Sequence, residues 1–314
     1  MEKKKRQHYV WQYYLKNWSQ NKSQVNCLRD GKIFLSGTSC LAIEKYFYKL
    51  DEITLYDLSL LATLYVQDMI GIAREYAENV LKTFRQLIEI RDKQRSTISD
   101  NKKLNEALDI LFTNVEEDYH AKIESGSALY LKNIVNKDIS FYSNPDDNWN
   151  FNLFLTTQYM RTKNIRDSIL SQIANKPDIL ASITRSMSVL RFIVSPIFAA
   201  GLSAHSDEYC MYLLLNESDN QFITGDQPVI NTKAVYHDVS SGFVNDLELY
   251  YPVSPTTAIL LSKEEMINTN NTIVITSTEA DKYNDLMFDS SHEQVFAFEE
   301  KQLVKYQSRI TVTK

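Results

Sequence analysis

Glycine, proline and cysteine are scarce in this sequence of 314 residues, with 7, 6 and 3 copies respectively. So few glycines and prolines argue against a fold built from many tight hairpins and favour long helices. The three cysteines, Cys27, Cys40 and Cys210, include no Cys-x-x-Cys pair. Their odd number and their spacing argue against a disulfide framework or a cysteine-based zinc site, and they fit a reducing cytoplasm.

Long hydrophobic runs are also missing, because no stretch approaches 18 apolar residues. The N-terminus begins charged and then becomes aromatic, so it lacks the hydrophobic core of a signal peptide. We therefore expect no transmembrane helix, no membrane partner and a cytoplasmic location. The net charge of -6 argues against nucleic-acid binding over the whole surface but leaves a local basic groove open.

The common catalytic motifs are absent as well. There is no phosphate-binding glycine-rich loop, no Gly-x-Ser-x-Gly elbow, no His-Glu-x-x-His, and no arginine followed four to six residues later by histidine. The five histidines are scattered along the chain. Only folding can bring two of them together, so any acid–base site has to be assembled from distant segments.

The first fifty residues predict a small mixed cap. Aromatic and apolar residues over 7–18 recur at helical spacing, with His8 at the start of the expected helix. A helix N-terminus disfavours the charged imidazole, so His8 would be neutral and suited to act as a base or a metal ligand. The alternative is a packed, hydrogen-bonded histidine. Residues 24–36 predict a hairpin that turns at Asp30-Gly31, and 40–48 predict a third short element.

Apolar periodicity then changes along the chain from helical to alternating. Helices are predicted over 54–95, 102–113, 114–137, 150–174 and 178–203, with Pro196 kinking or ending the last one near residues 194–195 and a loop at 143–149. Strands are predicted at 209–215, 221–224, 229–231, 247–251, 258–261, 272–276, 295–298 and 310–312, with a helix at 279–287.

The predicted fold class is therefore α+β. It comprises an N-terminal aromatic helix and hairpin cap over 1–50 packed on the rest, a helical body over 51–205, and a mixed, largely antiparallel sheet over 206–314. We expect these parts to form one integrated domain.

The acidic residue with the most conformationally restricted neighbours lies in Phe-Ile-Thr-Gly-Asp-Gln-Pro-Val-Ile at residues 222–230. Asp226 follows a short strand, and Pro228 rigidifies the chain after it. This placement suits a catalytic carboxylate, and it equally suits an Asx-turn that stabilises its own backbone.

Two further polar clusters accompany this segment. One is Gln7-His8-Tyr9. The other runs from Gln158 to Thr162, and Gln158 and Arg161 are expected to share a helix face because they lie three residues apart. Together His8, Arg161 and Asp226 supply a candidate base, a fixed cation and a carboxylate, which suits hydrolysis or transfer at a phosphate ester.

Gln7, Gln158, Gln227 and Asn284 are the candidate substrate-binding residues around these three. A divalent metal at Asp226 is left open, because metal-dependent nucleases usually need two or more carboxylates. The same residues would also suit recognition of a phosphorylated ligand without chemistry.

These motifs resemble a widespread bacterial family of unknown function. Its members begin with His-Tyr-(Val/Ile)-Pro, as at residues 8–10 here, and continue with an Arg-Thr step similar to Arg161-Thr162. A Phe-Ile-Thr-(Ser)-Asp-x-Pro-Val segment similar to 222–229, a Pro-(Leu/Val)-Ser-Pro bend similar to 252–255, and a late helical asparagine similar to Asn284 follow. The resemblance runs nearly end to end and implies that His8, Arg161 and Asp226 converge.

Two positions depart from the family pattern: Trp11 stands where proline is usual, and Gly225 stands where serine is common. Some members resemble components of bacterial defence loci. The resemblance therefore implies an effector role but specifies no reaction. Because His8, Arg161 and Asp226 suit phosphate-ester chemistry, the predicted function is a cytoplasmic effector or toxin-like hydrolase acting on nucleic acid or a nucleotide in phage defence, with a protein partner of a defence system also open.

Two other functions remain open. One is a non-enzymatic module that binds a phosphorylated small molecule or a partner protein, with Arg161 as the anchor. The other is a structural subunit of a larger complex, which would expose a large aromatic surface. The oligomeric state does not follow from the sequence.

Overall fold

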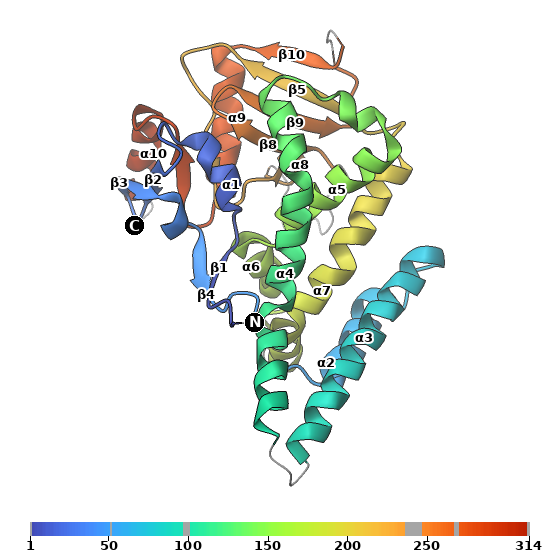
Figure 1. Ribbon diagram of the computed structural model, residues 1–314. Coiled ribbons are helices and arrows are strands. Elements are labelled where there is room, and N and C mark those ends of the chain that lie inside the picture. The colour runs from blue at the N-terminus through green and yellow to red at the C-terminus, as the bar shows by residue number, and fades with distance from the viewer. Residues whose placement is uncertain (1, 51, 97–100, 236–246, 267–269, 313–314) are drawn as a thin grey trace.

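The computed structural model describes residues 2–50, 52–96, 101–235, 247–266 and 270–312. The predicted α+β class is confirmed, with long helices in the middle of the chain and sheets built from both of its ends (Figure 1). The helices are α1 (Gln12–Leu15), α2 (Leu55–Leu61), α3 (Gly71–Ser96), α4 (Lys102–Val135), α5 (Pro145–Met160), α6 (Lys163–Ser171), α7 (Pro177–Ala204), α8 (Thr232–Val235), α9 (Ser277–Ser290) and α10 (Lys301–Val312). The strands are β1 (Arg6–His8), β2 (Gln24–Arg29), β3 (Lys32–Gly37), β4 (Ile43–Lys45), β5 (Cys210–Asn216), β6 (Thr224–Gly225), β7 (Ile230–Asn231), β8 (Leu249–Ser254), β9 (Thr257–Ser262), β10 (Thr272–Ile275) and β11 (Val295–Ala297).

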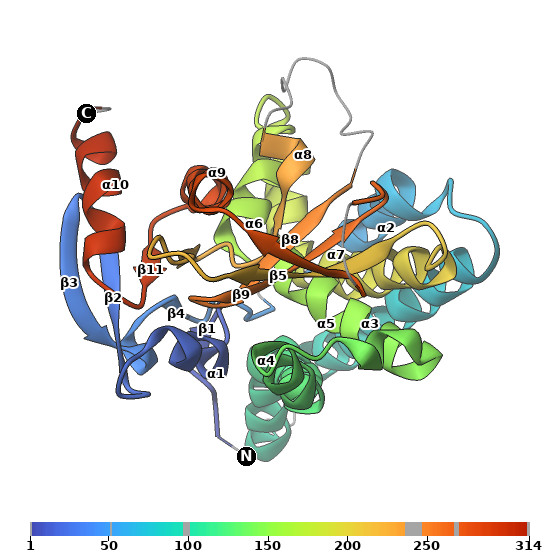
Figure 2. The same cartoon turned by 90° about the horizontal axis from the view of Figure 1, so that it is seen from above.

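The larger sheet has the strand order β10-β5-β9-β8-β7. Its β10 and β5 are parallel and its other neighbours antiparallel, which confirms the predicted mixed, largely antiparallel C-terminal sheet. Successive residues of β8 point to opposite faces: Tyr250 stacks on Tyr283 of α9, and Tyr251 stacks on Tyr14 of α1. The sheet is thus covered on both sides (Figure 2), and every residue of β8 is buried.

The predicted hairpin is confirmed, since β2 and β3 pair around Asp30 and Gly31. Both turn residues have positive φ, 51° and 71°, as a two-residue type I′ turn requires. The hairpin forms one side of a second sheet with the order β3-β2-β11-β6, and α10 packs against it. The cap is therefore built from both ends of the chain, which no pattern within the first fifty residues could indicate.

Residues 7–18 are only partly helical, so the predicted helix is wrong in its first turn. His8 lies in β1, where it pairs with Ile43 of β4. Trp11 is extended and precedes the short α1, which runs into a 3-10 turn over Lys16–Trp18. Pairing with β4, a long-range partner, decides the conformation of His8.

Helical structure over 54–95 and 102–137 is confirmed: α2 and α3 are joined through a π-helical turn at Ala62–Val66, and α4 is a single helix of 34 residues. The loop predicted at 143–149 is wrong. The Asn144 side chain accepts hydrogen bonds from the backbone N–H groups of Asp146 and Asp147, and Pro145 is the first residue of α5. Asn144 therefore acts as the N-cap of α5 and Pro145 as its first residue, although both residues are also common in turns.

The single helix predicted over 150–174 is also wrong, because the chain breaks between α5 and α6. Arg161 ends α5, and Thr162 is extended, with φ -83° and ψ 164°. Arg161, a sequence-predicted site residue, therefore lies at a helix junction rather than on a helix face, with Thr162 beside it.

Pro196 lies inside α7 and does not end it. Proline cannot donate to the carbonyl four residues earlier, that of Phe192, and the Tyr76 hydroxyl donates to this oxygen instead at 3.0 Å. By length and composition α7 could cross a membrane, but 56% of its apolar window is buried inside the protein, as in the core helix of a protein that spans no membrane. It is the one helix among the described residues that satisfies these criteria of length and hydropathy.

The last strand predicted, at 310–312, is wrong as well, since α10 continues to Val312. Leu303 and Tyr306 of this helix are buried three residues apart, and they anchor it against the second sheet.

Two hydrophobic cores are present: one surrounds the sheets, and the other lies between α2, α3, α4 and α7. In the second core the buried Asp57 ties α2 to α7. Its carboxylate accepts hydrogen bonds from the Ser182 hydroxyl at 2.6 Å and from Arg185 at 2.7 and 3.0 Å. The predicted boundary at residue 51 lies outside the described residues.

We expect Asp57→Asn to lower the free energy of unfolding by about 2 kcal/mol, because it weakens the charge-assisted hydrogen bonds of the buried Asp57 with the partly exposed Arg185. Burial raises the pKa of Asp57, but hydrogen bonds from Arg185 and Ser182 outweigh it and leave the pKa lowered. The stabilisation is therefore present above the ordinary aspartate pKa and is lost as the pH falls through the lowered, folded-state value.

Urea denaturation of the parent and Asp57→Asn at neutral and acidic pH measures this contribution. Glu78→Gln is the matched control, because Glu78 forms an exposed pair with Arg74 that should contribute less than about 0.5 kcal/mol. A loss no larger than the control's would contradict the assignment.

Candidate functional site

The segment 222–230 connects the two sheets. Its β6 pairs with β11 in the four-stranded sheet, and its β7 pairs with β8 in the five-stranded sheet. Asn284 of α9 holds the first part in place: its side chain accepts from the Ile223 N–H and donates to the Gln221 carbonyl, both at 2.9 Å. Buried Asn284 thus supplies the hydrogen bonds that a neighbouring strand would otherwise provide.

The Asp226 carboxylate binds the loop that follows α9. It accepts hydrogen bonds from the backbone N–H groups of His292, Glu293 and Gln294 at 2.7, 2.8 and 3.0 Å. Asp226 is 1% exposed. Burial raises its pKa, against the opposing effect of the three hydrogen bonds and of His292. The side chain therefore reaches a distant loop rather than closing an Asx-turn on its own segment.

Gly225 allows this close approach. A Cβ at this position would lie 1.9 Å from the Ser291 hydroxyl oxygen and 3.3 Å from the Gln294 carbonyl oxygen. A serine, which is common here in the family that the sequence resembles, would force the Ser291 side chain aside and crowd the loop backbone, and the glycine avoids this crowding.

Gln227 links the segment to the helix junction. Its side chain accepts a hydrogen bond from the Thr162 hydroxyl and donates to the carbonyls of Tyr159 and Val229. Two motifs that lie more than sixty residues apart in the sequence are thereby in direct contact.

Arg161 is the centre of a buried polar cluster. Its guanidinium donates to the Tyr48 hydroxyl at 2.9 Å, to the Glu124 carboxylate and to the backbone carbonyl of His8. The side chain is 2% exposed. Burial lowers the pKa of Arg161, but Tyr48, Glu124 and nearby Glu117 outweigh burial, so the charge is retained.

His8 and Arg161 are thus brought together, although the contact is through the His8 backbone. Burial and the Arg161 charge lower the pKa of His8, which favours the neutral imidazole. The expected protonation state holds for a different reason, since His8 lies in a strand and not at a helix N-terminus.

Asp226 does not join this pair: among the described residues its side-chain hydrogen-bond partners are the three loop nitrogens. Its connection to Arg161 is indirect and runs through the neighbouring Gln227 and Thr162. The catalytic roles of His8, Arg161 and Asp226 stay predictions.

The remaining sequence candidates are buried, and all but Gln158 hydrogen bond to backbone groups or neighbouring side chains among the described residues. Gln7 donates to the Thr113 carbonyl at 2.9 Å and accepts from the Tyr48 N–H at 2.7 Å, which fixes β1 and Tyr48 against α4. Gln158 lies beside Glu124. The substrate contacts predicted for Gln7, Gln158, Gln227 and Asn284 stay predictions.

Ionisable residues of α4, which the sequence analysis did not select, complete the cluster. Glu116, His120 and Glu124 recur every four residues and are buried. Arg191 of α7 binds Glu116 at 3.1 Å, and Arg161 binds Glu124. The four-residue spacing of ionisable side chains in an otherwise amphipathic helix was the available signal, but it is also typical of an exposed helix face.

Glu117 has an unusual protonation state for an acidic residue. Burial raises its pKa to about 7, with Glu124 adding to the rise and Arg161 opposing it. His120 is neutral, because burial and the charges of Arg161 and Arg191 lower its pKa well below the usual range.

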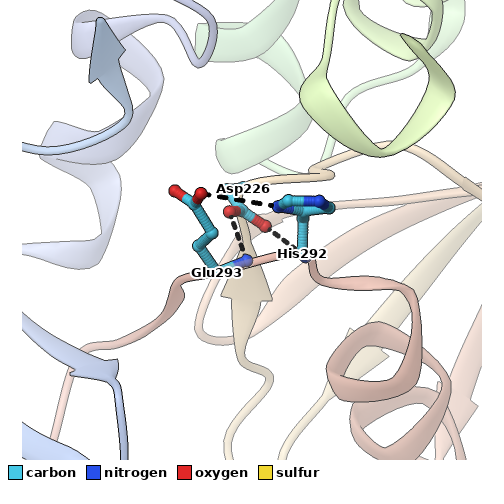
Figure 3. Close-up of side chains that lie close together, drawn as sticks. All are labelled: Asp226, His292 and Glu293. Atoms are coloured by element: carbon cyan, nitrogen blue, oxygen red, sulfur yellow. Dashed lines mark hydrogen bonds and ion pairs between the residues drawn. The ribbon is translucent and has the colours of Figure 1, made fainter. Parts of the chain in front are cut away.

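A second cluster lies at the protein surface, on the loop that Asp226 holds. Ligand atoms of Asp226, His292 and Glu293 lie within 4.8 Å of one another, and Figure 3 shows the three side chains meeting at the end of β6. His292 is also paired with Asp167 at 3.1 Å, and Lys163 lies between Glu293 and Glu44. His292 and Glu293 are exposed, so this is the part of the predicted site that solvent can reach.

The sequence comparisons identify the family of the chain. The sequence pattern of DUF4238, a family of proteins of unknown function, matches residues 6–301, and the chain belongs to this family. No curated protein and no solved structure matches the chain. The family assigns no reaction, so function has to be inferred from the site.

The raised pKa of Glu117 predicts a pH-dependent stability. A carboxyl group that keeps its proton in the folded state costs stability as the pH rises from its ordinary pKa to about 7. We expect Glu117→Gln to remove this loss. The free energy of unfolding of the variant minus that of the parent should therefore be about 2–3 kcal/mol larger at pH 8 than at pH 4.

Chemical denaturation across this pH range measures the difference. Asp118→Asn is the control, because Asp118 is the exposed neighbour paired with Lys4 and should not reproduce the trend. A parallel pH profile for the parent and Glu117→Gln would show that Glu117 titrates normally.

Proposed function

We propose that the protein is a hydrolase that cleaves phosphate esters of nucleic acid or a nucleotide, with a divalent cation bound by Asp226, His292 and Glu293. The observation that carries the proposal is the convergence of these three ligand groups at an accessible surface. The proposed setting is that of a cytoplasmic effector, with a role in phage defence suggested by the family resemblance.

The donor chemistry fits a cation. Asp226 uses three of the roughly four lone-pair sites of its carboxylate for backbone N–H groups, which leaves one for a metal. Imidazole and carboxylate together suit Zn²⁺ or Mn²⁺, and a bound cation of this kind lowers the pKa of a coordinated water and stabilises charge on a phosphoryl oxygen.

The neighbours of the cluster suit a phosphate substrate. The Asp167 carboxylate lies 3.1 Å from His292 Nε2 and can orient the ring, as carboxylates commonly do for metal-bound histidines. Lys163 keeps Glu44 as a partner at 2.9 Å if Glu293 turns to a cation, so its ammonium group stays in place to attract a phosphate.

The alternative is a non-enzymatic module that binds a phosphorylated ligand through Arg161. The geometry gives it less support, because the Arg161 side chain is 2% exposed and all three guanidinium nitrogens donate hydrogen bonds. A phosphate reaching Arg161 would have to displace Glu124 and Tyr48.

The test uses the purified full chain, with Mn²⁺, Zn²⁺ and Mg²⁺ each titrated by calorimetry and then assayed with nucleotides and single- and double-stranded nucleic acid. We expect His292→Ala and Glu293→Gln to weaken cation binding by about 10–100-fold and to reduce hydrolysis accordingly. His205→Ala and Glu300→Gln, which change an exposed histidine and an exposed glutamate elsewhere, are the matched controls.

A parent protein that binds none of the three cations, or variants that bind and hydrolyse as the parent does, would contradict the proposal. Binding of a nucleotide without turnover, insensitive to His292→Ala, would favour the non-enzymatic module. Expression of the same variants in bacteria tests the effector role, since toxicity should depend on His292 and Glu293 but not on His205.

A further inference from the structure

A cleft lies between α3, the first turns of α4 and the segment that leads into α2. Its volume is about 570 Å³, which is within the range of sites that bind small organic ligands. None of its lining residues belongs to the cluster of Asp226, His292 and Glu293. The lining combines three cationic side chains with three buried apolar ones, and this combination indicates the class of ligand.

The cations of the cleft are Lys49, Arg91 and Arg95. Arg91 and Arg95 lie one turn apart on α3, so their charges are on the same face of the helix. Like charges at this spacing repel each other, and an anion bound between them offsets the repulsion. The planar fork of an arginine also matches the oxygens of a phosphoryl group.

Arg91 is held firmly at the wall of the cleft. Its side chain is only 10% exposed, and its guanidinium lies over the ring of Phe112, 5.5 Å from the ring centroid. It donates hydrogen bonds to the Asp92 carboxylate at 2.9 Å and to the Ile53 carbonyl at 2.8 Å. These bonds use two of the five N–H donors of an arginine, so a fixed cation with donors to spare lines the cleft. A group fixed in this way loses little conformational freedom when it binds an anion.

The acids that line the cleft are much more exposed than Arg91. Glu52 pairs with Arg95 at 3.2 Å, but its side chain is 77% exposed. Asp109 pairs with Lys3 and is 44% exposed. Exposed ion pairs of this kind are screened by water and contribute little to stability, so a phosphate can replace Glu52 as the partner of Arg95 at small cost.

The rest of the argument concerns the apolar part of the lining. Leu50, Leu108 and Phe112 are buried side chains at the edge of the second hydrophobic core. An inorganic anion would leave this wall in contact with water, and a purely apolar ligand would leave the arginines without an anion. A ligand that carries both a phosphate and an apolar group satisfies the whole lining.

We propose that this cleft is a binding site for an organic phosphate, with the phosphoryl group between Arg91 and Arg95 and the apolar part against Leu50, Leu108 and Phe112. The site needs no metal ion and shares no residue with the surface cluster, so it is independent of the proposed hydrolase activity. A ligand bound there contacts α3, α4 and the segment that leads into α2 at once. Its binding therefore stabilises the folded helical body.

Calorimetric titration of the full chain with AMP, inorganic phosphate and adenosine, all in EDTA, tests the proposal. EDTA removes divalent cations and so excludes metal-dependent binding at the Asp226 cluster. We expect AMP to bind more tightly than either of the other two, and Arg95→Gln to weaken AMP binding by about ten-fold. Glu52→Gln should strengthen it by about three-fold, because it removes the carboxylate that competes for Arg95. Arg91 is left unchanged, because its removal would also leave the Ile53 carbonyl unpaired.

Arg74→Gln is the matched control, because Arg74 lies on the same helix and forms an exposed pair with Glu78 outside the cleft. His292→Ala should bind AMP as the parent does, which separates this site from the proposed metal site. The proposal is overturned if AMP binds no more tightly than adenosine or inorganic phosphate. It is also overturned if Arg95→Gln and Glu52→Gln both bind AMP as the parent does, or if Arg74→Gln weakens binding as much as Arg95→Gln.

Discussion

The buried guanidinium of Arg161 is the interaction on which the arrangement of the helical body and the N-terminal segment depends. It stands at the break between α5 and α6 and holds Tyr48, Glu124 of α4 and the backbone of His8 at once. A buried charge is tolerated only when it is paired and fully hydrogen-bonded, so these three partners must all be in place. The Arg161-Thr162 step thus marks a structural junction in this chain.

Asp226 plays a comparable part at the other end of the site. Its carboxylate gathers three consecutive backbone N–H groups and so fixes the loop on which His292 and Glu293 stand. A buried acid therefore positions two exposed ligand groups. The residues that the sequence suggested for one site therefore belong to two places: Arg161 lies in a buried cluster, whereas Asp226 lies beside the exposed His292 and Glu293.

The elements that could be predicted are those whose signals are local. The Asp30-Gly31 turn requires positive φ at both positions, and the apolar periodicity of α3 and α4 continues for many turns. The secondary-structure predictions were wrong where a residue distant in the sequence decides the local conformation. His8 became a strand residue by pairing with Ile43, and α7 passes Pro196 with Tyr76 bonding the freed carbonyl.

The sequence by itself determined the α+β class, the hairpin, the long helices and the segments that carry the site residues. It could single out His8, Arg161 and Asp226 because each is framed by neighbours of a distinctive kind. Only the tertiary structure decided that Arg161 meets the His8 backbone while Asp226 turns to residues 292–294. The reason is physical: the direction of a buried polar side chain is set by whichever donors and acceptors the fold brings within reach, and those lie many residues away.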